Sequence, residues 1–242
     1  MGLLDFIFPK YCVNCKKLGL HLCSDCFSYL SFDVNNICLV CGRQSINSLT
    51  HPFCRTRYTI DGAFSALNYK GPVKKLIYQF KYKPYLTDLK TILCDLLYEA
   101  LIQKEEFNEI FQGSSDLIFV PIPLYKSKQR GRGYNQAEIL AGELRKRLDP
   151  SRSLRMTMIN ILERTRNTKS QVGLKKEERR KNIKGAFEIS KRLNLGQGST
   201  LKQASILLVD DVLTTGSTLL EAASVLKRNG VKKVYGLTLA KD

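Results

Sequence analysis

Seven of the eight cysteines in this 242-residue chain lie within its first 54 residues, and their spacing is that of metal ligands. Two thiolates three residues apart can bind one metal ion from a single turn, and two such turns complete a tetrahedral site. The chain contains four such pairs, in the last of which a histidine replaces a thiolate: Cys12 and Cys15, Cys23 and Cys26, Cys38 and Cys41, His51 and Cys54. The pattern predicts one or two structural zinc ions.

The spacing leaves the combination of the pairs open. Sequential pairing gives two small zinc ribbons, whereas alternate pairing gives a cross-braced module. His21, next to Cys23, is a second imidazole that could compete with His51. Disulfides are disfavoured because nothing in the chain indicates secretion. A segment this short has few large apolar side chains, so metal binding is expected to supply much of its folding free energy. Cys94, in an apolar stretch, is expected in the core.

A second chemical signal is the run VDDVLTTGST, from Val209 to Thr218. An apolar strand at 206–209 is followed by Asp210 and Asp211, and ligands of open α/β sheets bind at that end of a strand. A loop with Gly216 then leads into a helix, whose first N–H groups and dipole favour a phosphate. Vicinal ribose hydroxyls can donate to the two carboxylates. The hydroxyls that could bind the phosphate belong to Thr214, Thr215, Ser217 and Thr218. The run predicts a site for a 5-phosphoribose.

Strand and helix patterns alternate in the part of the chain that must position these residues. Such alternation predicts an α/β domain with a mostly parallel sheet flanked by helices. We expect a zinc-binding domain at 1–57 and this α/β domain at 58–242. The expected strands are 60–70, 117–122, 206–209 and 231–239, and 159–163 is a short apolar run; the expected helices are 73–82, 86–102, 134–148 and 218–228; the expected loops are 103–115 and 196–203.

The run at 209–218 resembles the motif with which type I phosphoribosyltransferases bind phosphoribosyl pyrophosphate (PRPP). By that resemblance, Asp210 and Asp211 would hold the ribose hydroxyls, and residues 214–218 would hold the 5-phosphate. The chain as a whole resembles the ComF family, named for DNA uptake in natural competence. The supporting stretches are the cysteine pairs and residues 120–138, 163–171 and 179–187. His51 is a departure, because relatives often carry a cysteine there.

Two basic stretches are further candidates for anion binding. The first contains Lys126, Lys128, Arg130 and Arg132 and is expected to be a loop that holds pyrophosphate, with Arg132 and Gly133 nearest the next helix. A solvated basic loop is the alternative, particularly at the two lysines. Asn135 is expected to cap the helix that follows.

The second stretch, 164–180, lies where such enzymes carry a mobile catalytic loop. A loop that closes over a diphosphate excludes water and stabilises the charge of the leaving group. Arg164 and Arg166 are therefore catalytic candidates, and a disordered basic linker is the equal alternative. Lys175 to Lys181 are expected to be solvated or to contact nucleic acid.

The amino-acid composition limits the kinds of partner that the protein could bind. The chain has 39 Lys and Arg against 22 Asp and Glu, a net charge of +17, which attracts nucleic acid, anionic lipid or phosphate-rich metabolites. A solvated basic surface explains the charge equally well. No apolar run reaches the roughly 18 residues of a transmembrane helix, and the N-terminus lacks signal-peptide features, so a cytoplasmic location is expected. The GxxxxGK[ST] motif of nucleotide hydrolases is absent.

Two functions fit these observations. The first is an enzyme that displaces pyrophosphate from PRPP with a nitrogen nucleophile, while Mg²⁺ neutralises the charge of the leaving group. Chains like this one are commonly labelled amidophosphoribosyltransferases, but the N-terminal cysteine of a glutaminase is absent, so the nucleophile is unidentified. The second is a non-catalytic factor that binds single-stranded DNA together with other competence proteins and uses PRPP as a regulatory ligand.

Overall fold

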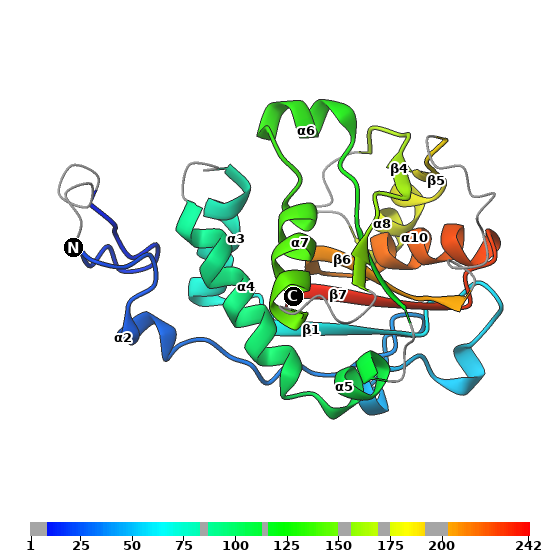
Figure 1. The fold of residues 1–242 in the computed structure, drawn as a ribbon, viewed down its shortest axis with the longest axis horizontal. Helices are drawn as coiled ribbons and strands as arrows, with labels where there is room; N and C mark the ends of the chain where they lie inside the picture. The colour runs from blue at the N-terminus through cyan, green and yellow to red at the C-terminus, as the bar shows by residue number, and fades with distance from the viewer. Residues whose placement is uncertain (1–8, 83–86, 113–115, 150–155, 169–174, 192–202) are drawn as a thin grey trace.

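The computed structural model describes residues 9–82, 87–112, 116–149, 156–168, 175–191 and 203–242 (Figure 1). A five-stranded sheet with the order β1-β7-β6-β2-β3 forms its centre. Each pair of neighbours in it is parallel. The strands are β1 (Gly62–Asn68), β2 (Leu117–Pro121), β3 (Met156–Met158), β6 (Ser205–Leu213) and β7 (Lys233–Lys241). The predicted α/β fold with a parallel sheet is confirmed.

Helices cover both faces of the sheet, because successive side chains of a strand point to opposite faces. In β6, Leu207 and Val209 belong to one core and Ile206 and Leu208 to the other. The first core is covered by α3 (Gly71–Tyr82), α4 (Thr87–Ile102), α5 (Glu105–Gln112) and α7 (Gln136–Leu148); the second by α8 (Lys176–Ile183) and α10 (Ser217–Arg228).

Smaller elements complete the fold. They are α2 (Ser24–Phe27), the 3-10 turns η1 (Ile46–Ser48) and η2 (Pro52–Cys54), α6 (Lys126–Arg132), and the antiparallel pair β4 (Leu162–Arg164) and β5 (Phe187–Ile189). No described helix is long and apolar enough to span a membrane.

Three local predictions were wrong. The loop expected at 103–115 contains α5, which forms because Phe107 is buried in the first core. The basic loop expected before Asn135 is the short helix α6, which ends at Gly133 in a left-handed conformation with φ 80°. Strand β6 continues to Leu213, because its pairing with β7 runs through the acidic residues. The loop expected at 196–203 lies almost entirely outside the described residues.

The cysteine-rich segment wraps around the free edge of β1. Val13 packs into the first core and Leu39 into the second, so the segment contacts both faces of the sheet. Along the edge, the N–H of Asn68 donates to the carbonyl of Ser31 at 2.9 Å, and the N–H of Thr50 donates to the carbonyl of Asp61 at 2.8 Å. In Figure 1 the blue chain starts beside α3 and passes the sheet toward its opposite end. An edge strand that would otherwise offer unpaired backbone groups is thereby covered.

Candidate zinc sites and an anion-binding cavity

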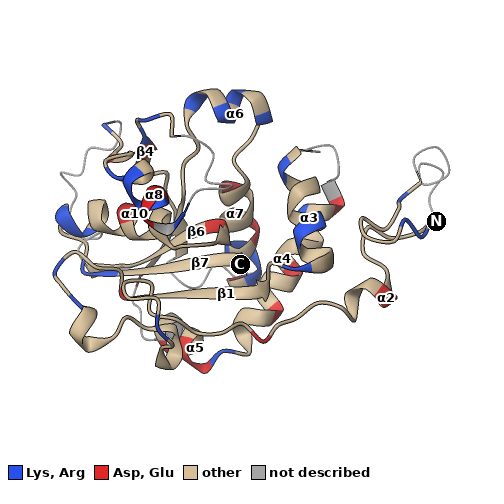
Figure 2. Cartoon of the chain, turned by 180° about the vertical axis from the view of Figure 1, so that it is seen from behind, with Lys and Arg blue, Asp and Glu red and all other residues tan. Residues whose placement is uncertain are grey.

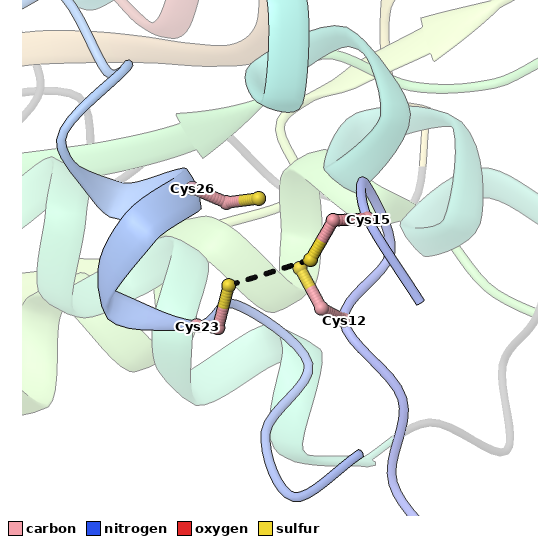
Figure 3. Close-up of side chains that lie close together, drawn as sticks. All are labelled: Cys12, Cys15, Cys23 and Cys26. Atoms are coloured by element: carbon pink, nitrogen blue, oxygen red, sulfur yellow. Dashed lines mark hydrogen bonds between the residues drawn. The ribbon is translucent and has the colours of Figure 1, made fainter. Parts of the chain in front are cut away.

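The metal-ligand residues gather into two groups by sequential pairing. One group is Cys12, Cys15, Cys23 and Cys26; the other is Cys38, Cys41, His51 and Cys54. Within each group the ligand atoms all lie within 4.8 Å of one another. Figure 3 shows the four thiols of the first group pointing toward a common centre, with 3.5 Å between the sulfurs of Cys15 and Cys23. A tetrahedral zinc ion with Zn–S bonds of about 2.3 Å requires sulfurs roughly 3.8 Å apart. Both groups therefore fit structural zinc, and the cross-braced alternative is not the one that forms.

The second group uses His51 as its fourth ligand. Its Nδ1 lies 3.3 Å from the sulfur of Cys41, and its Nε2 lies 2.8 Å from the carbonyl oxygen of Gln44. A backbone acceptor at the far ring nitrogen orients an imidazole for metal binding through the other nitrogen. His21, the competing imidazole, is buried but belongs to neither group.

A cavity of about 530 Å³ opens at the carboxyl end of β6. It is lined by most of the residues predicted to bind PRPP: Arg132, Arg164, Asp210, Asp211, Thr214, Gly216, Ser217 and Thr218. Three candidates are not part of this lining. Thr215 instead lies with its hydroxyl 2.8 Å from that of Ser217, Gly133 ends α6, and Arg166 donates to the carbonyl of Lys184.

The two aspartates are in different environments although they are adjacent. Asp211 forms an ion pair with Lys81, with 2.9 Å between Oδ1 and Nζ. Asp210 forms no ion pair with any residue in the described part of the chain, and its Oδ1 accepts the N–H of Asp211 at 2.9 Å. Burial and the neighbouring charge of Asp211 raise the pKa of Asp210 to about 7. Burial alone would lower the pKa of Lys81, but the charge and hydrogen bond of Asp211 outweigh it, so the pKa of Lys81 is raised. The cavity therefore contains one carboxylate that can accept a hydrogen bond from a hydroxyl, Asp210, and one that is already paired with a cation, Asp211.

Lys81 is placed by residues at and just before the start of α7. The hydroxyl of Tyr134 donates to the carbonyl of Phe80, and the amide of Gln136 donates to the carbonyl of Lys81 at 3.5 Å. Asn135 caps α7 as predicted, because its Oδ1 accepts the N–H of Ala137 at 3.1 Å. Tyr134 and Gln136 therefore fix the last turn of α3 against the start of α7, which brings Lys81 to the aspartates.

Three cations, Arg132, Arg164 and Lys128, also line the cavity, and we call them the cationic wall. Arg132 donates to Oε1 of Gln136 at 3.0 Å and lies over the ring of Tyr82, 5.4 Å from its centroid. Arg164 stacks on Phe187, and its Nε is buried without a hydrogen-bond partner among the described residues. Burial lowers the pKa of the Arg164 guanidinium. Burial, together with the positive charges of Arg164 and Arg132, lowers the pKa of Lys128. Cations that destabilise one another in this way are suited to an anion with several charges.

Several lining residues had no signal in the sequence. Lys81 lies in an amphipathic helix, where nothing in the pattern distinguishes it from an exposed lysine. Lys128 belongs to the basic stretch expected to hold pyrophosphate, for which a solvated loop was the alternative, and it lines the cavity. Arg179, which was placed in a basic surface run, lines it as well. The cavity also includes Tyr69, Lys74, Tyr82, Gln136 and Asp242. Only the spatial arrangement shows that these residues face one site.

The loop before α10 has the geometry of a phosphate site. Gly216 is the N-cap of α10 and has φ 73°, a left-handed conformation that side chains rarely adopt. The first residues of this 12-residue helix, Ser217 and Thr218, line the cavity together with Thr214. The first turn of a helix and the positive end of its dipole favour a bound phosphate.

Comparisons with known proteins agree with this arrangement. The model of the double zinc ribbon domain matches residues 3–56, and that of the phosphoribosyl transferase domain matches residues 132–242. Competence protein F of Haemophilus influenzae is 34% identical over 175 residues, 72% of this chain and 70% of that protein. DNA utilization protein YhgH of Escherichia coli K12 is 32% identical over 168 residues, 69% and 66% of the two chains. Competence protein ComFC of Bacillus subtilis is 26% identical over 216 residues, 86% and 79% of the two chains. The chain therefore belongs to the ComF family, with a double zinc ribbon followed by a phosphoribosyltransferase domain.

Proposed function

We propose that the cavity binds PRPP with Mg²⁺ and that the protein serves in the cytoplasm in DNA uptake, the role that the names of its relatives suggest. Asp210 and Asp211 would accept the ribose hydroxyls, and residues 214–218 would hold the 5-phosphate. Arg132, Arg164 and Lys128 would face the pyrophosphate. The observation that carries this proposal is the meeting of a carboxylate pair, a helix N-terminus and a cationic wall in one cavity.

If the protein is an enzyme, the leaving group is pyrophosphate and the bond broken is the one between it and C1 of the ribose. Arg164 is the better placed of the two catalytic candidates, because it lines the cavity whereas Arg166 does not. It also lines a neighbouring cavity of about 500 Å³ whose wall carries Glu138 and Glu163. Carboxylates of this kind could accept the N–H groups of a nitrogen nucleophile. We propose the neighbouring cavity as the place of the acceptor.

Calorimetric titration of PRPP with Mg²⁺ tests the binding proposal. We expect the double variant Asp210→Asn/Asp211→Asn to lose affinity by about 100-fold or more, roughly 2.7 kcal/mol, because both acceptors of the ribose hydroxyls lose their charge. Asp95→Asn is the matched control, since Asp95 is also paired with a cation, Arg147 at 2.7 Å, but lies outside the cavity. Absence of binding to the folded, zinc-loaded wild type would refute the proposal.

Single-stranded DNA binding is the second candidate function, and one surface favours it. The ring of Tyr58 lies between two guanidiniums, 5.8 Å from Arg57 and 5.6 Å from Arg228. Neither arginine forms an ion pair within the described ranges, and Phe53, nearby in the sequence, is fully exposed. Figure 2 shows basic residues at the end of α10, where Arg228 lies. Exposed aromatic rings among unpaired cations are the elements with which proteins bind unpaired bases and their phosphates.

The variant Arg57→Ala/Arg228→Ala separates this surface from the cavity. We expect its affinity for an oligothymidylate to fall about tenfold and the slope of log K against log salt to decrease by roughly 1.4, since two phosphate contacts are lost. Its affinity for PRPP should not change. Lys70→Ala/Lys191→Ala, which removes two exposed cations elsewhere, serves as the charge control. Equal losses in the two variants would mean that only net charge matters and would exclude a defined DNA site here.

A further inference from the structure

The turn formed by Leu39 and Val40, between Cys38 and Cys41, packs against the loop that precedes α10. We call this loop, residues 214–216, the phosphate loop. The first residue of the turn, Leu39, is 3% exposed and belongs to the same core as Leu213 and Leu219. A methyl group built at Gly216 would lie 3.1 Å from Cδ2 and 3.2 Å from Cδ1 of Leu39. The loop backbone therefore rests on this leucine, and Gly216 lacks a side chain at the point where a zinc turn packs against it.

The same turn also contacts α8, the helix that contributes Arg179 to the cavity lining. The carbonyl of Val40 accepts a hydrogen bond of 3.1 Å from Nη2 of Arg180, in α8. The preceding residue, Arg179, lines the cavity. Two consecutive residues of one zinc turn are thus joined to two parts of the cavity, one through packing and one through a charge-assisted hydrogen bond.

The first zinc site offers a natural comparison, because its turn is built in the same way. Val13 follows Cys12 as Leu39 follows Cys38, and it is buried in the first core. The carbonyl of Asn14 accepts from Nζ of Lys75 in α3 at 3.3 Å. This turn holds a helix that contributes Lys81 to the cavity, but it does not contact the loop at Gly216.

We propose that the second zinc site positions the phosphate loop, with Leu39 as the positioning residue. The two zinc ligands on either side of the Leu39–Val40 turn fix its backbone, so that Leu39 supports Gly216 and keeps the first N–H groups of α10 in place. The second zinc ion thereby affects the affinity for the 5-phosphate end of the ligand without touching it. This inference rests on the proposed binding of PRPP.

Leu39→Ala tests the inference through the ligand's separate parts. We expect the affinities for PRPP and for ribose 5-phosphate to fall about tenfold each, whereas the affinity for pyrophosphate with Mg²⁺ should stay within roughly twofold. Leu39→Met should restore most of the loss, because it refills the space behind Gly216. Val13→Ala is the matched control and is expected to leave all three affinities within about twofold. Metal analysis of each variant should give two zinc ions per chain, as the two ligand groups require.

The outcomes are distinct. If wild type binds PRPP and Leu39→Ala binds ribose 5-phosphate equally well, the positioning role is wrong while PRPP binding stands. If Val13→Ala lowers the affinities for the ligands as much as Leu39→Ala does, the cause is a general loss of stability and the inference is likewise wrong. If wild type binds no PRPP, both proposals fail together.

Discussion

Removal of zinc is expected to unfold the cysteine-rich segment and to destabilise the rest of the chain with it. The interior of the first ribbon consists of ligands, since the buried side chains that form its own cluster are those of Cys12, Cys23 and Cys26. Zinc binding to such sites is worth roughly 10–16 kcal/mol in small zinc domains, far more than so small a cluster could supply. Without zinc, the four cysteines lose the metal bonds that hold their sulfurs within 4.8 Å of one another.

The effect should extend to the sheet because the segment packs on it from both sides. Loss of the segment exposes the edge of β1 and uncovers apolar side chains in both cores, at the places where Val13 and Leu39 packed. Exposed edges of this kind promote association between chains. We therefore expect chelation to replace the single cooperative unfolding transition by a broader one at a lower temperature. The chelated protein is also expected to aggregate on heating.

Differential scanning calorimetry before and after chelation measures this, with re-addition of zinc as the test of reversibility. The variants Cys15→Ser and Cys41→Ser, each at an exposed ligand, separate the two sites. We expect both to lose one zinc ion, and only the Cys41 variant to lose affinity for ribose 5-phosphate as well. An unchanged melting transition after verified loss of both ions would contradict the structural role of the metal.

The zinc ligands, and the strand, acids and glycine around the proposed phosphate loop, could be predicted because each pattern lies within a short stretch of sequence. A pair of cysteines with two residues between them implies a turn wherever it occurs, and the run from Val209 to Thr218 contains its strand, its acids and its glycine in order. The structure adds the sequential pairing of the cysteines, which spacing could not decide because it depends on how the chain folds back between the pairs.

The rest of the cavity could not be predicted because it depends on contacts between distant segments. Lys81 reaches Asp211, 130 positions away, only because Tyr134 and Gln136 hold the end of α3. The helix α6 was predicted to be a loop because Gly131 and the closely spaced cations of this segment disfavour a helix locally. The contact of Leu39 with Gly216 joins a zinc turn to a phosphate loop, and neither motif indicates the other.

Asp210 is expected to lower the stability of the free protein at neutral pH. Its pKa is about 7 in the folded chain against an ordinary 3.8, because burial and Asp211 disfavour its charge. Between these two values the folded state binds more protons than the unfolded one, so the contribution of Asp210 to stability is complete below about pH 4 and is lost as pH rises through 7. In the proposed function, an ionised Asp210 is the acceptor that a ribose hydroxyl would need.

The variant Asp210→Asn should remove this pH dependence, since the amide has the same shape and does not titrate. Denaturant unfolding at pH 4.5, 6 and 8 should show a stability gain over wild type that grows with pH to about 2–4 kcal/mol, as expected for a shift of roughly three pKa units partly offset by lost hydrogen bonds. Asp95→Asn is again the control for loss of a carboxylate outside the cavity. PRPP affinity of the wild type should rise between pH 6 and 8 in the same measurements, and that of Asp210→Asn should stay low. A gain in stability that is equal at all three pH values would mean that Asp210 is ionised throughout and that its neighbours already compensate its charge.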